Sequence, residues 1–307
     1  MSDPVCFSRE KDQHKTETSL IIKPMKIRHF LFVALLINLT GCASLINSAS
    51  EKMADNLSRA MLEQNDLEIV QSGMPAYLIM VDSLLQGDPQ NASLLLSAAK
   101  LNGAYSSAFV TDEKRKKKLT GKSYHYAHTA LCLELKSICE RLEGELEDLQ
   151  TALDSLDEDQ QPLLYAFATS WAGWIQAHSD DWNALAQIPK LTALFKRSVE
   201  LNPAFDYGGG YVYLGVLAAQ IPPSLGGKPA QARAWFEKAQ KIADGKNLMT
   251  DVLFAEHYAR LVFDRDLHDR LLKHVLAAPA EQAGLTLINT LAQRRAATLL
   301  EESEDFF

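Results

Sequence analysis

The chain has 307 residues, a formal net charge of −8 and 47% hydrophobic residues. This length and composition are sufficient for one large globular domain with its own core. The acidic balance and the lack of a basic domain exclude nucleic acid as an expected partner, because phosphate binding requires clustered Lys and Arg.

The front of the chain has the pattern of a bacterial secretion signal. Lys26 and Arg28 precede a short apolar run, residues 30–39, and small residues follow it. A bilayer-spanning helix takes ~20 apolar residues, so this run is too short to be one. We expect a signal peptide at residues 25–41 and interpret residues 1–24 as an untranslated or disordered extension. The alternative is a buried core segment.

The sequence Leu-Thr-Gly-Cys that ends this segment resembles the lipobox of bacterial lipoproteins. The resemblance implies cleavage before Cys42, lipid attachment to Cys42, and a lipidated tether at residues 42–55. Acyl chains bury ~0.8 kcal/mol per methylene in a membrane, which would anchor the chain there facing the periplasm. Ala43 follows the cysteine, and by resemblance to the enterobacterial sorting pattern this favours the outer membrane.

Residues 56–307 read as a series of helices. Apolar periodicity predicts helices at residues 56–70, 76–86 and 92–110, with a break at residues 72–75 and a stop at residues 87–89. No segment favours a strand. We expect an all-α fold, a tetratricopeptide-like stack of antiparallel helix pairs in a single domain.

Residues 132–156 follow a heptad, which predicts a long helix within the fold or, alternatively, an intermolecular coiled coil. Cys132 and Cys139 then lie on one helical face, two turns apart. Two turns span about 10 Å along the axis, and a disulfide requires Cα atoms within about 7 Å. We therefore expect two buried free thiols; the alternative is a reactive pair.

The centre of the chain has the clearest sequence patterns of helix packing. Residues 162–177 are nearly all apolar, which is typical of a helix in the middle of a bundle or one that lines an apolar channel. Residues 191–244 form three helical blocks, separated at Asn202-Pro203 and Pro222-Pro223, in which small residues alternate with aromatic ones. Tetratricopeptide-type helix pairs pack in this way. Further helices are predicted at residues 248–263, 267–276 and 285–300.

The sequence contains only weak indications of a metal, nucleotide or catalytic site. His125 and His128 can share a helix face, but no third metal ligand is evident, and His268 and His274 are expected on the surface. The glycines at 208–210 and 226–227 lack the strand–turn–helix context of a phosphate or dinucleotide loop. We expect no catalytic residue, no metal, no cofactor and no enzymatic activity.

Several blocks together resemble the T-component of tripartite ATP-independent periplasmic (TRAP) transporters. They are LLYAFATSWAGWI (163–175), LFKRSVELNPAFDYGGGYVYLGVLAAQIPPSLGGKPAQARAWFEKA (194–239), KNLMTDVLFAEHYA (246–259) and LINTLAQRRAATLLEESEDFF (287–307). Lys228 stands where this family often has Asp, so we assign that position no ligand role. The resemblance implies a lipid-anchored helical protein that forms a homotrimer with a channel or cleft through each protomer. It also implies binding to the transporter's periplasmic solute-binding component.

On this resemblance we expect the helices at residues 162–177 and 207–220 to line an apolar passage for a small, partly hydrophobic ligand. The alternative is that their aromatic residues belong to the core. A different function also stays open, that of a general envelope scaffold that binds proteins and no small molecule. The candidate ligand-channel residues are Trp171, Trp174, Tyr207, Tyr211 and Tyr213.

Overall fold

The computed structural model describes residues 56, 59–220 and 227–307. Helices make up most of this part of the chain, and no strand occurs in it, which confirms the predicted all-α fold. The described helices belong to one compact unit, Ser58–Phe307. The predicted signal peptide, Cys42, the tether and the turn at residues 222–226 lie outside the described residues.

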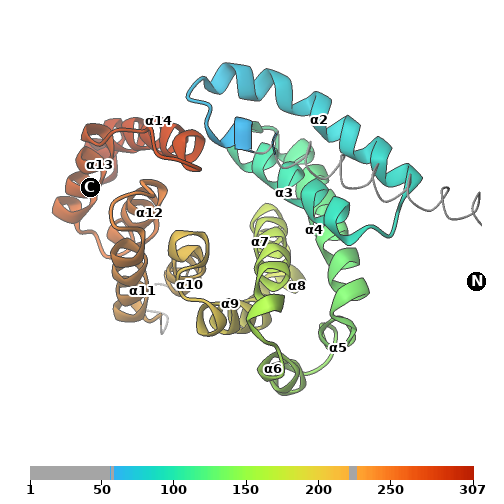
Figure 1. Ribbon diagram of the computed structural model, residues 1–307. Coiled ribbons are helices and arrows are strands. Elements are labelled where there is room, and N and C mark those ends of the chain that lie inside the picture. Colours follow the sequence, from blue (N-terminus) through green and yellow to red (C-terminus); the bar gives the residue numbers. More distant parts are fainter. Residues whose placement is uncertain (1–55, 57–58, 221–226) are drawn as a thin grey trace, which may run out of the picture. The chain divides into compact units, whose positions relative to one another are not determined.

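The helices follow one another along the chain, and Figure 1 labels those from α2 to α14. They are α2 (Leu67–Gly87), α3 (Ala92–Phe109), α4 (Glu113–Glu134), α5 (Lys136–Cys139), α6 (Leu146–Asp154), η1 (Glu158–Gln160), α7 (Gln161–Ala177), α8 (Trp182–Leu185), α9 (Ile188–Leu201), η2 (Phe205–Gly208), α10 (Gly209–Ala218), α11 (Pro229–Ala243), α12 (Met249–Leu253), η4 (Phe254–Ala259), α13 (Arg265–Ala277), α14 (Thr286–Glu301) and α15 (Ser303–Phe306).

Neighbouring helices pack against one another in sequence order. Contacts join α2 to α3, α3 to α4, α4 to α7, α7 to α9, α9 to α10, and α10 to α11. The interior of this stack is apolar, and each fully buried large side chain contributes about 1.5–3 kcal/mol. The largest are Phe167, Phe195, Phe236, Leu131, Ile138, Leu149, Leu164, Leu191, Leu194, Leu248, Leu272 and Leu299.

Small residues set the close approach of two helix pairs. On α3 and α4, Ser123 Oγ donates to the Ala99 carbonyl oxygen at 2.8 Å, and a Cβ at Gly103 would lie 3.1 Å from the same Oγ. On α10 and α11, a Cβ at Gly215 would lie 2.8 Å from the Phe236 ring. These positions accept little or no side chain because the neighbouring helix occupies that space.

The predicted break at residues 72–75 is wrong, because α2 runs through Pro75 without interruption. The predicted helix at residues 56–70 is interrupted at residues 63–66, and α2 begins at Leu67, where the Asp66 carboxylate accepts from the Glu68 and Ile69 backbone N–H groups. An internal proline costs about 3 kcal/mol. That cost is offset by a stripe of buried side chains that continues across the proline at helical spacing. The stripe consists of Val70, Met74, Leu78, Val81 and Leu85.

The predicted long helix at residues 132–156 is also wrong. Leu135 adopts φ −123° and ψ 59°, which ends α4, and two short helices, α5 and α6, follow. The apolar residues of the heptad still enter the core, because Leu135, Ile138 and Leu149 are buried. They do so from three separate segments, so the repeat reflects burial and indicates neither one continuous helix nor a coiled-coil seam.

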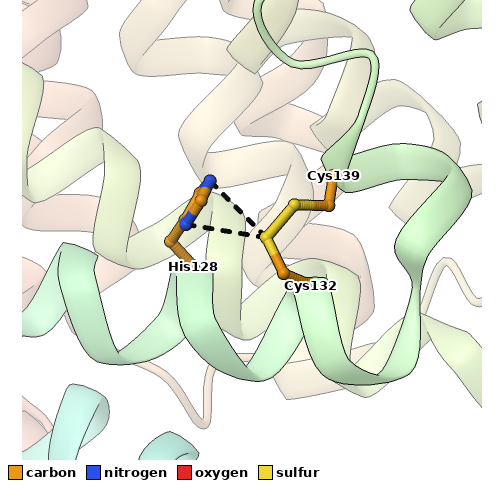
Figure 2. A group of neighbouring side chains, drawn as sticks. All are labelled: His128, Cys132 and Cys139. Carbon is orange, nitrogen blue, oxygen red and sulfur yellow. Dashed lines mark hydrogen bonds between the residues drawn. A yellow bond between two sulfur atoms is a disulfide. The ribbon is translucent and has the colours of Figure 1, made fainter.

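The break at Leu135 overturns the prediction of two free thiols. Cys132 and Cys139 form a disulfide, with their Cα atoms 5.0 Å apart. The expected separation of about 10 Å assumed one straight helix. Figure 2 shows that the chain instead turns after α4 and brings Cys139 back over Cys132.

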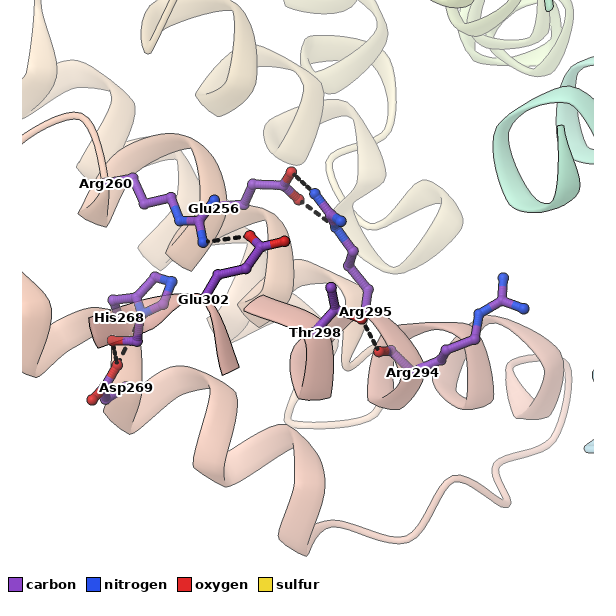
Figure 3. A network of polar contacts seen from close by, with 9 residues as sticks. Glu256, Arg260, His268, Asp269, Arg294, Arg295, Thr298 and Glu302 are labelled. Atoms are coloured by element: carbon purple, nitrogen blue, oxygen red, sulfur yellow. Dashed lines mark hydrogen bonds and ion pairs between the residues drawn. The ribbon is translucent and has the colours of Figure 1, made fainter. Parts of the chain in front are cut away.

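Polar contacts join the C-terminal helices (Figure 3). The Arg295 guanidinium pairs with Glu256 of η4, and Arg260 Nη2 lies 3.0 Å from Glu302 Oε2. His268, expected on the surface, is fully buried, and its Nδ1 lies 2.9 Å from Asp269 Oδ1. The sequence signal was misleading because His268 shares the apolar face of α13 with Leu271, Leu272 and Val275.

The last part of the chain contacts the first. Helix α14 packs on α2, and the Gly284 N–H donates to Glu63 Oε1 at 2.6 Å. Arg294 Nη2 donates to the Ala108 carbonyl oxygen, near the end of α3, at 2.8 Å. Leu287 of α14 also packs against the buried side chains of α2. The helix stack therefore has contacts between its two ends as well as between neighbours.

Candidate functional site

The two tryptophans of α7 differ in environment. Trp171 is only 3% exposed and belongs to the core. Trp174 is half-buried and stacks on Tyr124 of α4, with ring centroids 5.5 Å apart, and on His178, at 4.6 Å. Of this predicted pair, only Trp174 is partly exposed.

Tyr211 has a packing role between α10 and α11. It is 3% exposed and stacks on Trp235 with centroids 5.4 Å apart, and Lys238 Nζ lies 4.3 Å from its ring centroid. A ring held on one side by an indole and approached by an ammonium group is a stable helix–helix contact.

Tyr207 and Tyr213 flank the start of α10. Tyr213 is half-buried and stacks on Phe195 of α9, with centroids 4.6 Å apart. The Tyr207 hydroxyl donates to the Ala283 carbonyl oxygen at 3.4 Å. The five predicted aromatics therefore belong to several clusters, and the structure does not bring them to a single point.

The connection from α9 to α10 has an unusual backbone. Asn202 ends α9, and its Oδ1 accepts from the Ala204 N–H at 3.1 Å. Asp206, Tyr207 and Gly208 then adopt left-handed conformations, with φ of 50°, 54° and 79°. For a residue with a Cβ this conformation costs about 1–2 kcal/mol. Strained backbone of this kind persists only where its surroundings enforce it, and it concentrates at functional sites.

The glycines after the left-handed turn allow it to press against α7 and α9. A Cβ at Gly209 would overlap the Tyr165 hydroxyl and come within 2.9 Å of Asp206 Oδ2. A Cβ at Gly210 would lie 2.5 Å from Val199 Cγ1. The glycine run is therefore required by this close approach, independently of any phosphate-binding role.

The left-handed turn delivers a carboxylate to a buried tyrosine. The Tyr165 hydroxyl, on α7, donates to Asp206 Oδ2 at 2.6 Å, and the Tyr165 and Tyr213 rings lie edge to face with centroids 6.2 Å apart. We call Tyr165, Asp206 and Tyr213 the tyrosine–aspartate site.

The charge balance of this site is set by burial. Burial raises the pKa of Tyr165 well above its usual range, and the nearby Asp206 charge raises it further. Burial and the same charge raise the pKa of Tyr213 to about 12. The pKa of Asp206 is itself raised by desolvation, although the Tyr165 hydrogen bond and the Lys100 charge act to lower it. The Tyr165 hydroxyl already donates to Asp206, and the Tyr213 hydroxyl keeps its proton near pH 7.

Solvent reaches both Asp206 and one side of α7. Asp206 is exposed as a residue, although its carboxylate is desolvated against Tyr165. On α7, Thr169, Ala172 and Gly173 are half-buried, whereas most residues of this helix are buried. Thr169 and Ala172 follow Tyr165 at helical spacing, so they share its face. This stripe of the tryptophan-bearing helix is therefore partly accessible to solvent.

A separate polar cavity of about 190 Å³ lies where α11, α12 and α13 meet. Gln240 Nε2 donates to Asp251 Oδ1 at 2.6 Å, and His274 Nδ1 lies 2.7 Å from Asp251 Oδ2. The buried Thr250 hydroxyl faces no hydrogen-bond partner among the described residues. At about 30 Å³ per water molecule the cavity holds several waters or one small polar group. None of its lining residues belongs to the tyrosine–aspartate site.

Tyr165 and Asp206 were not among the predicted site residues. Two signals pointed to them. A tyrosine inside a nearly apolar helix needs a partner for its hydroxyl, and an aspartate just before a glycine run marks a turn with positive φ. Neither signal identifies the two residues as partners, because they are separated by 41 residues.

Comparisons with known proteins agree with these observations. The family model described as TRAP transporter T-component matches residues 63–307, which include every helix from α2 to the C-terminus. A curated protein of Treponema pallidum (strain Nichols), described as uncharacterized, is 23% identical over 271 residues. That similarity covers 82% of this chain and 84% of the relative.

Proposed function

The chain belongs to the TRAP transporter T-component family, and from this membership we propose that it is a periplasm-facing lipoprotein accessory of such a transporter. In this proposal it binds the solute-binding component and channels a small, partly hydrophobic ligand. It acts by binding and transfer, and no catalytic step is assigned to it.

The observation that carries the ligand proposal is the tyrosine–aspartate site. Asp206 keeps contact with solvent while the surrounding protein raises its pKa, as expected for a carboxylate on the wall of a passage. Strained backbone presents this carboxylate to Tyr165 of α7 and close to Tyr213. A ligand with a hydrogen-bond donor at one end matches Asp206, and its apolar part matches the aromatic and small residues nearby.

The attachment to the membrane is proposed from the front of the chain. Residues 25–41 act as the signal peptide, Cys42 receives the lipid, and residues 42–55 tether the helical domain, residues 56–307, to the outer membrane. Among the described helices, none is both long and apolar enough to cross a bilayer. We also propose that the mature protein is a homotrimer.

The test begins with a pull-down of the tagged lipoprotein from membranes. Co-purification of a periplasmic solute-binding protein is expected, and its absence from repeated preparations would contradict the partner assignment. Replacement of Cys42 by Ala should abolish incorporation of labelled fatty acid, whereas unchanged labelling would refute the anchor.

Native mass spectrometry of the same preparation tests the ligand. We expect a bound small molecule whose occupancy falls in Asp206→Asn, because one hydrogen bond to a charged group contributes about 1.5–3 kcal/mol, roughly tenfold or more in affinity. Asp251→Asn, in the separate polar cavity, is the matched control and should keep the ligand. If the protein is empty while the solute-binding protein still co-purifies, the scaffold function replaces the channel.

A further inference from the structure

The junction between α4 and α5 brings three potential metal ligands together (Figure 2). His128 lies one turn before Cys132 on α4, and Cys139 ends α5. Their ligand atoms, a ring nitrogen of His128 and the two sulfurs, all lie within 4.8 Å of one another. In the oxidised protein the two sulfurs are bonded to each other.

We propose that the reduced protein binds a thiophilic d¹⁰ metal ion of the Zn²⁺ type through His128, Cys132 and Cys139. The disulfide and the metal site are then two alternative states of the same junction. This site is independent of the transport role.

The distances fit such an ion. In a tetrahedral zinc site with Zn–S of about 2.3 Å and Zn–N of about 2.0–2.1 Å, a sulfur and a nitrogen lie about 3.6 Å apart and two sulfurs about 3.8 Å apart. Cys132 Sγ already lies 3.6 Å from His128 Nδ1 and 3.7 Å from Nε2. The two sulfurs must separate, which rotation about the Cα–Cβ bonds provides at a Cα–Cα distance of 5.0 Å, and the His128 ring must turn one nitrogen toward the ion.

The surroundings keep the His128 ring beside the two sulfurs and leave the sulfurs accessible. The His128 ring packs against Tyr124 and Phe167, with centroids 5.7 and 6.1 Å away. Both cysteines are half-buried, so a reductant and an ion can reach them from solvent. Three protein ligands leave the fourth position of a tetrahedral ion for water.

The conversion balances as a two-electron reduction followed by metal exchange. A dithiol donor, either a small dithiol or a thioredoxin-type protein, breaks the S–S bond, passes two electrons and two protons to the cysteines, and leaves as its own disulfide. The ion then displaces the two thiol protons into water and binds both thiolates, together with a neutral His128 nitrogen.

Cobalt(II) titration of the lipoprotein tests the proposal, because cobalt replaces zinc and gives a thiolate charge-transfer band. After anaerobic reduction we expect one equivalent to bind with this band, and zinc to displace it. The oxidised protein should give no band. His128→Ala should weaken binding by roughly tenfold or more, whereas His125→Ala, three residues away on the same helix, should bind as the wild type does.

His128→Ala keeps the disulfide, so its fold can be verified by circular dichroism in the oxidised state before reduction. Two results would overturn the proposal. One is a reduced wild-type protein with no thiolate band at stoichiometric cobalt. The other is a His128→Ala variant that binds cobalt as tightly as the wild type.

Discussion

Replacement of Gly209 by Ala tests whether the left-handed turn depends on the tyrosine–aspartate contact. The new Cβ would overlap the Tyr165 hydroxyl and approach Asp206 Oδ2 to 2.9 Å. The hydroxyl must move, and the 2.6 Å hydrogen bond breaks. That loss costs about 1.5–3 kcal/mol because the acceptor is charged, and crowding adds about 1–3 kcal/mol.

The higher helix propensity of alanine offsets only a small part of this loss in stability. Gly209 is the first residue of α10, and alanine gains at most about 1 kcal/mol over glycine in a helix. We expect a net loss of about 2–4 kcal/mol in the free energy of unfolding. For a domain of this size each kcal/mol moves the melting temperature by about 2–4 °C. Urea and thermal unfolding followed by circular dichroism measure both quantities.

Two further variants make the test specific. In Tyr165→Phe the overlapping oxygen is absent, and the nearest ring carbon, Cζ, lies 3.3 Å from the position that the new methyl group takes. The cost of Gly209→Ala should then fall below about 1 kcal/mol, a non-additivity expected for residues in contact. Gly73→Ala is the control, because its Cβ meets nothing within 4 Å, and it should stabilise α2 slightly. An equal cost of Gly209→Ala in both backgrounds would refute the reasoning.

Three other perturbations have defined outcomes. Asp206→Asn should stabilise the protein at pH 7, since a raised folded-state pKa means that the ionised carboxylate disfavours folding. The gain should vanish as the pH falls below about 3.9, the unfolded-state value, and a gain that does not depend on pH would contradict the assigned cause. Loss of the Cys132–Cys139 disulfide in the double serine variant should cost about 2.5 kcal/mol in chemical denaturation, as estimated for a short closed loop; no change would contradict this. Arg295→Met should cost less than about 1 kcal/mol, because its pair with Glu256 is partly exposed, and a larger loss would mark a structural role for the pair.

Most helices were predictable because their ends are encoded locally. Asn202-Pro203 ends α9, Pro229 lies in the first turn of α11, and the stop at Gly87 ends α2 as expected. Pro75 gives an equally strong local signal, yet α2 continues through it. Burial of the α2 stripe against α3 outweighs the local cost of the proline, and a sequence pattern cannot show that balance.

The disulfide and the Tyr165–Asp206 pair could not be predicted from local sequence patterns. Leucine is a good helix former, so nothing at Leu135 indicated that α4 ends there and that the two cysteines meet. Likewise, Tyr165 and Asp206 become partners only when the turn between α9 and α10 packs against α7. The glycine run at residues 208–210 is evident in the sequence, but the need for it arises from the close approach of α7 and α9.

The contact of α14 with α2 limits how this fold can change during evolution. In repeat proteins stabilised only by neighbours, a unit can be gained or lost at either end with a modest change in stability. Here such a change would separate Glu63 from Gly284 and uncover apolar side chains at both ends of the stack. The number of helices is therefore constrained, and divergence within such a fold is expected in loops and side chains rather than in repeat number.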